Sequence, residues 1–148
     1  MLFRSHRAEW KEVIERAFGH KAYFLYAEQD GKIHGVLPLA HNNSLLFGNS
    51  LCSLSFCVYG GAAAASEEVR LALEKAAESL ANELGVDFLE LRNIAKQGHN
   101  WSSKDLYVTF RKEIDPDPDV NMQAIPRKQR AMVRKGIKAG LLTELDND

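Results

Sequence analysis

The period of the hydrophobic residues changes abruptly near residue 20, and this change constrains the fold more than any other feature. Apolar side chains recur at helical spacing over residues 8–18, and Gly19 follows as a C-terminal cap. Two β-rich segments, Lys21–Gln29 and residues 32–40, are joined by the turn dipeptide Asp30-Gly31. The N-terminal part of the chain therefore predicts an amphipathic helix followed by an antiparallel hairpin.

The middle of the chain alternates between strand and helix patterns. Residues 41–44 predict a turn, and residues 45–47 and 51–59 predict two strands. Ser66 is a suitable N-cap for a long apolar stripe that runs to Leu84 and ends at Gly85. Residues 86–91 then predict a strand, and this step from helix to strand is expected of parallel or mixed sheets.

The C-terminal part begins with a strand pattern and ends with a helix. Residues 106–114 alternate between apolar and polar side chains, and the two prolines in residues 115–118 cannot continue a strand. Pro126 suits the first position of a last helix, which we expect over residues 126–139, and residues 141–145 suit the start of another strand.

This order of elements predicts an α/β fold with a mixed, largely antiparallel sheet flanked by helices, analogous to the GNAT acyltransferase fold. A chain of 148 residues with 45% hydrophobic residues suits one domain, so we expect a single domain over residues 1–148. The two cysteines, Cys52 and Cys57, match no zinc pattern, and we expect free core thiols and no metal site.

Charge and hydropathy limit the partners of the whole molecule. The net charge is −1, so the chain as a whole does not attract nucleic acid or an anionic membrane. No apolar run approaches the ~20 residues of a membrane span, and the first residues lack the core of a signal peptide. These features predict a cytoplasmic protein without a membrane partner, whose oligomeric state the sequence leaves open.

The strongest local signal is the basic segment of the last helix, which contains no acidic residue. At about 100° per residue, six basic side chains share one half of the helix: Arg127, Lys128, Arg130, Arg134, Lys135 and Lys138. The other half carries Met132, Val133, Gly136 and Ile137, and we expect this half to dock on the domain. The repulsion among the like charges predicts an anionic partner for the basic half.

Several partners would satisfy this charge: a phosphate-bearing substrate, an RNA backbone or the acidic surface of another domain. A helix face that is simply solvated is the structural alternative.

A weaker signal is Tyr59-Gly60-Gly61, where two glycines after a strand permit positive φ and a close approach of a ligand, or only a tight connection. We interpret these three residues as the lining of a substrate cleft. Glu90 and Arg92 share a strand face and predict an ion pair. The chain carries neither a phosphate-binding glycine fingerprint nor a recognisable catalytic setting, so no catalytic residue is assigned.

Several motifs together resemble one family. The run Lys128-x-Arg130-x-x-Val133-Arg134-Lys135 looks like the basic helix of FemAB/FemX-type peptidyltransferases, although Gly136 stands where alanine is expected. Four further segments resemble the FemAB-related proteins of exosortase/PEP-CTERM systems in bacteria: 56–61, 89–93, 107–112 and 124–130.

The resemblance implies two tandem GNAT-like domains that move an acyl or aminoacyl group onto a cell-wall or exopolysaccharide-related substrate. It implies a phosphorylated small molecule or tRNA as substrate and aminoacyl-tRNA or acyl-CoA as donor, with no tightly bound cofactor. The present chain would be the first half, inactive alone, and its partner would be a C-terminal GNAT-like domain. Two other functions stay open, an RNA- or polyanion-binding module and a structural scaffold.

Overall fold

The computed structural model describes residues 6–46, 48–96, 98, 101–104 and 108–144. The chain divides into two compact units, Met1–Ser103 and Lys104–Asp148, each with its own set of elements. The first unit contains α1 (Glu9–Phe18), β1 (Lys21–Gln29), β2 (Lys32–Ser44), β3 (Gly48–Cys52), β4 (Ala63–Ala64), α2 (Glu67–Leu84) and β5 (Phe88–Glu90). The second contains α3 (Pro118–Ala124) and α4 (Arg127–Lys138). One continuous domain over both units stays a prediction.

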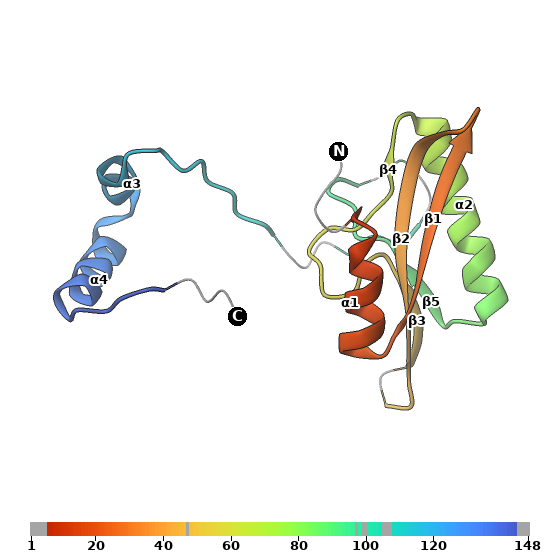
Figure 1. Cartoon of the computed structure of the whole chain (residues 1–148), viewed down its shortest axis with the longest axis horizontal. Helices are drawn as coiled ribbons and strands as arrows, with labels where there is room; N and C mark the ends of the chain where they lie inside the picture. The colour runs from red at the N-terminus through yellow and green to blue at the C-terminus, as the bar shows by residue number, and fades with distance from the viewer. Residues whose placement is uncertain (1–5, 47, 97, 99–100, 105–107, 145–148) are drawn as a thin grey trace. The chain divides into compact units, whose positions relative to one another are not determined.

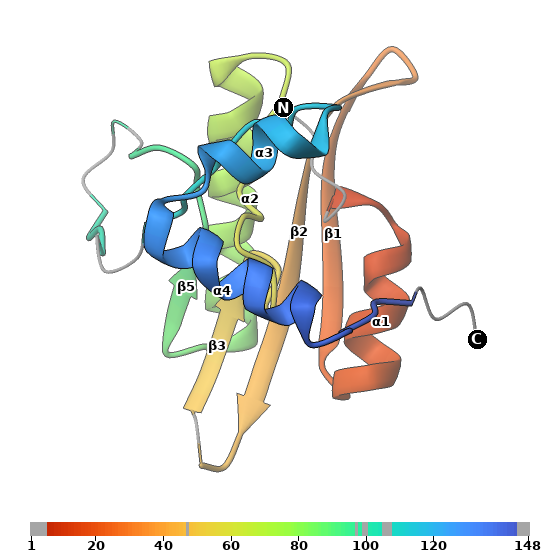
Figure 2. The same cartoon turned by 90° about the vertical axis from the view of Figure 1, so that its left-hand side faces the viewer.

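The sheet of the first unit is mixed and mostly antiparallel. Its strands lie in the order β1-β2-β3-β5 (Figure 2). The short β4 pairs with β2. Among the described strands, only β3 and β5 run parallel, with Ser50 opposite Phe88 and Cys52 opposite Glu90. The predicted hairpin is confirmed, since β1 and β2 pair antiparallel along their length. The expected α/β fold with a mixed, largely antiparallel sheet is therefore confirmed.

The two faces of the sheet bury different side chains. Leu37, Leu39 and Leu51 point to one face and form the main core with apolar residues of α2, including Leu73 and Ala77. Neighbouring strand positions point the other way, where a smaller cluster joins α1 to the sheet through Ile14, Ala22 and Ala40. Figure 1 shows α1 and α2 on opposite sides of β1 and β2.

Local capping chemistry explains where α1 and α2 begin and end. The Ser66 side chain accepts a hydrogen bond from the Val69 backbone N–H at 3.3 Å, which confirms Ser66 as the N-cap of α2. Gly19 ends α1 and Gly85 ends α2 in the left-handed conformation, with φ of 68° and 61°. None of the helices in the described ranges is long and apolar enough to cross a membrane.

Two predictions near residue 45 are wrong. Residues 41–44 form the end of β2 and not a turn, and the chain turns at Leu45 and Leu46, where a strand was expected. Pairing with β3 explains this difference, because the antiparallel ladder holds Asn42 and Asn43 in the strand despite their preference for turns. Phe47 lies outside the described residues. The strand expected over 51–59 ends at Cys52.

The strand predicted over residues 106–114 is also wrong where the structure describes it. Residues 108–114 form no strand, and the same is true of residues 141–144; Leu106, Tyr107 and Leu145 lie outside the described residues. An alternating pattern needs a neighbouring strand to pair with, and no described strand pairs with 108–114.

The pattern also missed a helix in the second unit. The aspartates among the prolines of residues 115–118 begin α3, where an Asp117 side-chain oxygen accepts from the Asp119 backbone N–H at 2.9 Å.

Candidate functional site

The basic segment forms a helix, as predicted. α4 covers Arg127–Lys138 with Pro126 at its N-cap, close to the expected 126–139. Of the six basic residues, all but Arg130 are exposed, and among the described residues none of the six makes an ion pair. We call the five exposed cations the basic face of α4: Arg127, Lys128, Arg134, Lys135 and Lys138. These side chains can meet several phosphate oxygens at once.

Arg130, the sixth basic residue, makes its contacts within its own unit. Its guanidinium donates at 2.9 Å to the carbonyl of Gln123 and at 3.0 Å to the carbonyl of Ile125. Both carbonyls lie at the C-terminal end of α3, where the last backbone oxygens of a helix lack partners within the helix. Arg130 therefore joins α3 to α4, and its hydrogen bonds are used within the protein. That Arg130 binds the anion together with the other five stays a prediction, and it would require the guanidinium to leave these carbonyls.

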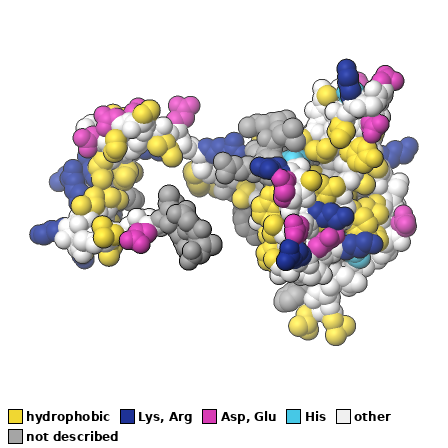
Figure 3. Space-filling view, viewed as in Figure 1, with side chains coloured by type: hydrophobic (Ala, Val, Ile, Leu, Met, Phe, Trp, Pro, Cys, Tyr) yellow, Lys and Arg dark blue, Asp and Glu magenta, His cyan; other side chains and the backbone are white. Residues whose placement is uncertain are grey.

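The apolar half of α4 is left exposed by the rest of its own unit. Met132 is 65% exposed, Val133 40% and Ile137 64%. Figure 3 shows that hydrophobic and basic side chains gather on different sides of the unit that holds α4. The expected docking of this apolar half on the first unit stays a prediction. The helix runs unbroken through Gly136.

The glycines of Tyr59-Gly60-Gly61 pack against the protein's own backbone. The backbone N–H groups of Gly60 and Gly61 both donate to the Arg92 carbonyl, at 3.1 and 3.2 Å. A Cβ at Gly60 would collide with the Ser53 carbonyl oxygen, and one at Gly61 with the Asn93 side chain. Neither glycine adopts the positive φ that the lack of a side chain permits. Close packing within the chain explains the pair, and the lining of a substrate cleft by these residues stays a prediction.

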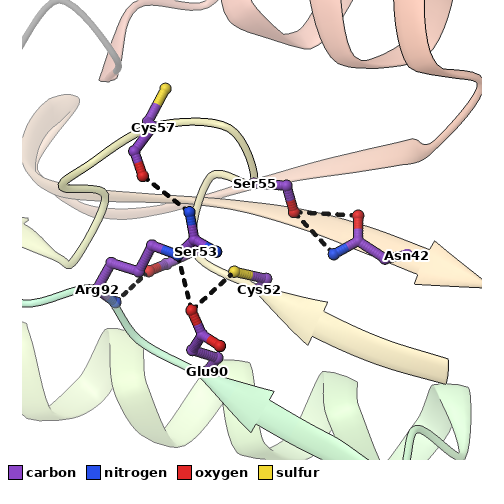
Figure 4. Close-up of polar contacts among 7 residues, drawn as sticks. All are labelled: Asn42, Cys52, Ser53, Ser55, Cys57, Glu90 and Arg92. Carbon is purple, nitrogen blue, oxygen red and sulfur yellow. Dashed lines mark hydrogen bonds and ion pairs between the residues drawn. The ribbon is translucent and has the colours of Figure 1, made fainter. Parts of the chain in front are cut away.

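A polar cluster gathers at the carboxyl ends of β3 and β5. We call it the loop cluster, and Figure 4 shows its members: Asn42, Cys52, Ser53, Ser55, Cys57, Glu90 and Arg92. The Ser53 N–H donates to the Glu90 carbonyl at 2.8 Å, which extends the parallel pairing by one residue. The buried Ser53 hydroxyl accepts from the Arg92 N–H at 2.7 Å. The edge where parallel strands end is a frequent place for ligands in α/β proteins.

Side chains of the loop cluster also hold the loop that follows β3. The predicted ion pair is confirmed, with Arg92 Nε 2.7 Å from Glu90 Oε1. The Arg92 Nη1 donates to the Cys57 carbonyl at 2.9 Å. Asn42 and Ser55 exchange two hydrogen bonds, at 2.7 and 3.0 Å. Ser53 and Ser55 were not predicted as part of a site, since their only signal is two small polar residues inside an apolar segment.

The two thiols of the loop cluster are poor nucleophiles. Burial raises the pKa of Cys52 to about 11, with Arg92 opposing the rise and Glu90 adding to it. Burial also raises the pKa of Cys57, again opposed by Arg92. Both thiols therefore stay protonated at neutral pH, and a protonated thiol does not attack a carbonyl. The contacts of the loop cluster stabilise the fold, and they provide no activated group.

In the loop after β3, two residues other than glycine have a positive φ. Leu54 has a φ of 50° and Phe56 a φ of 70°, in the left-handed region that costs most side chains about 1 kcal/mol or more. The Phe56 ring stacks on Phe18 with ring centroids 3.8 Å apart. The strained loop is thus fixed at one end by Arg92 and at Phe56 by α1.

Comparisons with family models, with curated proteins and with solved structures found no match to this chain.

Proposed function

We propose that this chain is the first, GNAT-like half of a FemAB-type acyl or aminoacyl transferase, in which the basic face of α4 binds phosphate groups of the substrate. One observation carries the phosphate-binding part of the proposal. Five cations lie exposed on one helix half, without an ion pair among the described residues. Repulsion between neighbouring cations costs helix stability, and a bound polyanion offsets this cost.

The transferase part of the proposal rests on the motif resemblance, together with a mixed sheet flanked by helices. The loop cluster supplies no activated nucleophile, because both of its thiols have raised pKa values. The chain's own contribution is therefore binding and positioning, which is a large part of catalysis in group transfer. Donor chemistry belongs to a second domain in this proposal, and aminoacyl-tRNA or acyl-CoA is the donor.

Binding of unfractionated tRNA at a series of salt concentrations tests the phosphate-binding part. We expect the affinity to fall steeply with salt, because each cation that contacts a phosphate displaces a counterion. Replacing Arg134→Gln and Lys135→Gln together should lower the slope by about two, one for each lost contact. Lys75→Gln, an exposed lysine of α2, is the matched control and should leave the slope unchanged.

A flat salt dependence, or equal slopes for the double variant and the control, would refute phosphate binding by this face. Transfer is tested on the full-length protein with a panel of aminoacyl-tRNAs and acyl-CoA as donors. Absence of transfer from every donor would remove the transferase part and leave a polyanion-binding module. We rank that second candidate lower because α4 has no aromatic side chain on which bases could stack.

A further inference from the structure

We propose that α4 lies flat on an anionic lipid bilayer, with its apolar half in the acyl boundary and its basic face on the lipid phosphates. The inference deepens the proposed function and rests on it, since the same basic face binds phosphate in both. The new element is the apolar half of the helix, which binding of a soluble phosphate leaves unused.

The distribution of side chains on α4 is that of an interfacial helix. Met132 and Ile137 are each about two-thirds exposed within their unit. Two more exposed apolar residues, Leu141 and Leu142, come after the helix, beyond Ala139 and Gly140. Helices with an apolar half and a polar half rich in Lys and Arg lie in the plane of the membrane interface. The long basic side chains reach outward to the headgroups while their stems cover apolar surface.

Charge complementarity selects an anionic bilayer. The sequence predicted no membrane partner because the net charge of the chain is −1. A bilayer in contact with the protein is attracted or repelled mainly by charges within a Debye length, about 10 Å. The residues of α4 include no acidic side chain that would offset the charge of its cations. Anionic leaflets attract such clusters by about fivefold in affinity for each cation near the surface.

The contact between α3 and α4 favours a flat surface over a protein that encloses the helix on all sides. Arg130 ties the N-terminal part of α4 to the carbonyls of Gln123 and Ile125. A partner that wraps around a basic amphipathic helix would have to displace this contact. A bilayer needs only one side of the helix and leaves α3 in place.

Sedimentation with lipid vesicles tests the inference on the whole chain. The vesicles contain phosphatidylcholine alone, or phosphatidylcholine mixed with phosphatidylglycerol. We expect binding to the mixed vesicles only. Met132→Ser with Ile137→Ser should weaken this binding by about tenfold or more, because the apolar contact is lost. Val120→Ser, an exposed apolar residue of α3, is the matched control and should bind like the unchanged protein.

Binding of tRNA by the same variants separates this inference from the proposed function. The apolar variant should keep its tRNA binding, whereas Arg134→Gln with Lys135→Gln should lose affinity for both tRNA and vesicles. Circular dichroism of each variant checks that α4 remains helical.

Three results would overturn the inference: no vesicle binding while tRNA binding persists, equal binding to both kinds of vesicle, or unchanged binding by the apolar variant. Each of them leaves the proposed function standing. If the protein without substitutions did not bind tRNA, the proposed function itself would be overturned.

Discussion

Arg92 donates from its Nη1 to the backbone carbonyl of Cys57, 35 positions earlier in the chain, at 2.9 Å. The same guanidinium is paired with Glu90, and the Arg92 backbone carbonyl accepts from both Gly60 and Gly61. One residue just beyond β5 therefore holds the loop that follows β3 at Cys57 and again at its end, at Gly60 and Gly61. This explains how Leu54 and Phe56 are held in left-handed conformations that a free loop would leave.

We predict that Arg92→Gln lowers the free energy of unfolding of the first unit by about 1–2 kcal/mol, the usual loss for a charged hydrogen bond to a carbonyl. Urea unfolding measures this change. Hydrogen exchange should accelerate first at the amides of Cys57 and Gly60. Lys75→Gln changes an exposed basic residue without such a contact and should be neutral. Equal stability of the two variants would contradict the role given to Arg92.

We predict a loss of stability at high pH from the buried thiol of Cys52. Its pKa in the folded protein is about 11, against an ordinary value of 9.0. The unfolded chain therefore loses this proton first as the pH rises. The contribution of the thiol is complete below pH 9 and disappears between about pH 9 and 11, at about 2–3 kcal/mol in total.

Cys52→Ala should remove this pH dependence. Unfolding by urea at a series of pH values, with both proteins in reducing buffer, measures the difference between them. The prediction is wrong if the difference between the two proteins stays constant from pH 8 to 11.

Local chemistry made part of this fold predictable. Ser66 caps the start of α2 and Gly85 caps its end, each through contacts within one turn. Asp30-Gly31 connects two strands that are adjacent in the chain and pair as a hairpin. These signals act over a few residues, so the sequence alone contains them. The parallel pairing of β3 with β5 was also predictable, because α2 lies between the two strands in the chain and a helix commonly connects parallel strands.

Contacts between distant residues were not predictable in the same way. The alternating pattern of residues 108–114 is typical of a strand. A strand also needs a neighbouring strand to pair with, and the pattern does not show whether such a strand is present. The position of Asn42 beside Ser55 depends on the path of the loop after β3. Helix geometry placed Arg130 correctly on the basic half, yet the direction of its side chain depends on the carbonyls that α3 leaves nearby.

We predict that Gly60→Ala destabilises the first unit by about 1–3 kcal/mol, the range for overpacking in a tight interior. The new Cβ would meet the Ser53 carbonyl and the Leu54 Cβ, the latter at 2.9 Å. Backbone atoms cannot move away as the end of a flexible side chain can. Gly98→Ala is the control, since no atom of the described residues lies within 4 Å of a Cβ there. Thermal unfolding of both variants measures the contrast, and similar melting temperatures would refute it.

We predict that Gly136→Ala stabilises α4 by about 1 kcal/mol, the difference in helix propensity between the two residues. Within the part of the chain that the structure describes, its new Cβ would meet only Leu141 Cδ1, at an ordinary contact distance of 3.5 Å. The far-UV circular dichroism should show more helix, and the α4 amides should exchange more slowly. Gly140→Ala should have the opposite effect, because Gly140 has a φ of 72°. A loss of helix on Gly136→Ala would contradict this prediction.

We predict opposite consequences for two arginines that the sequence placed in one set. Arg130→Gln should loosen the end of α3, because the carbonyls of Gln123 and Ile125 lose their donor. Exchange at the amides of α3 should then rise, while the salt slope of tRNA binding should change little. Arg134→Gln should leave α3 unchanged and lower the slope by about one. If Arg130→Gln lowers the slope as much as Arg134→Gln, the Arg130 guanidinium leaves α3 to meet the anion, and all six cations form one binding face.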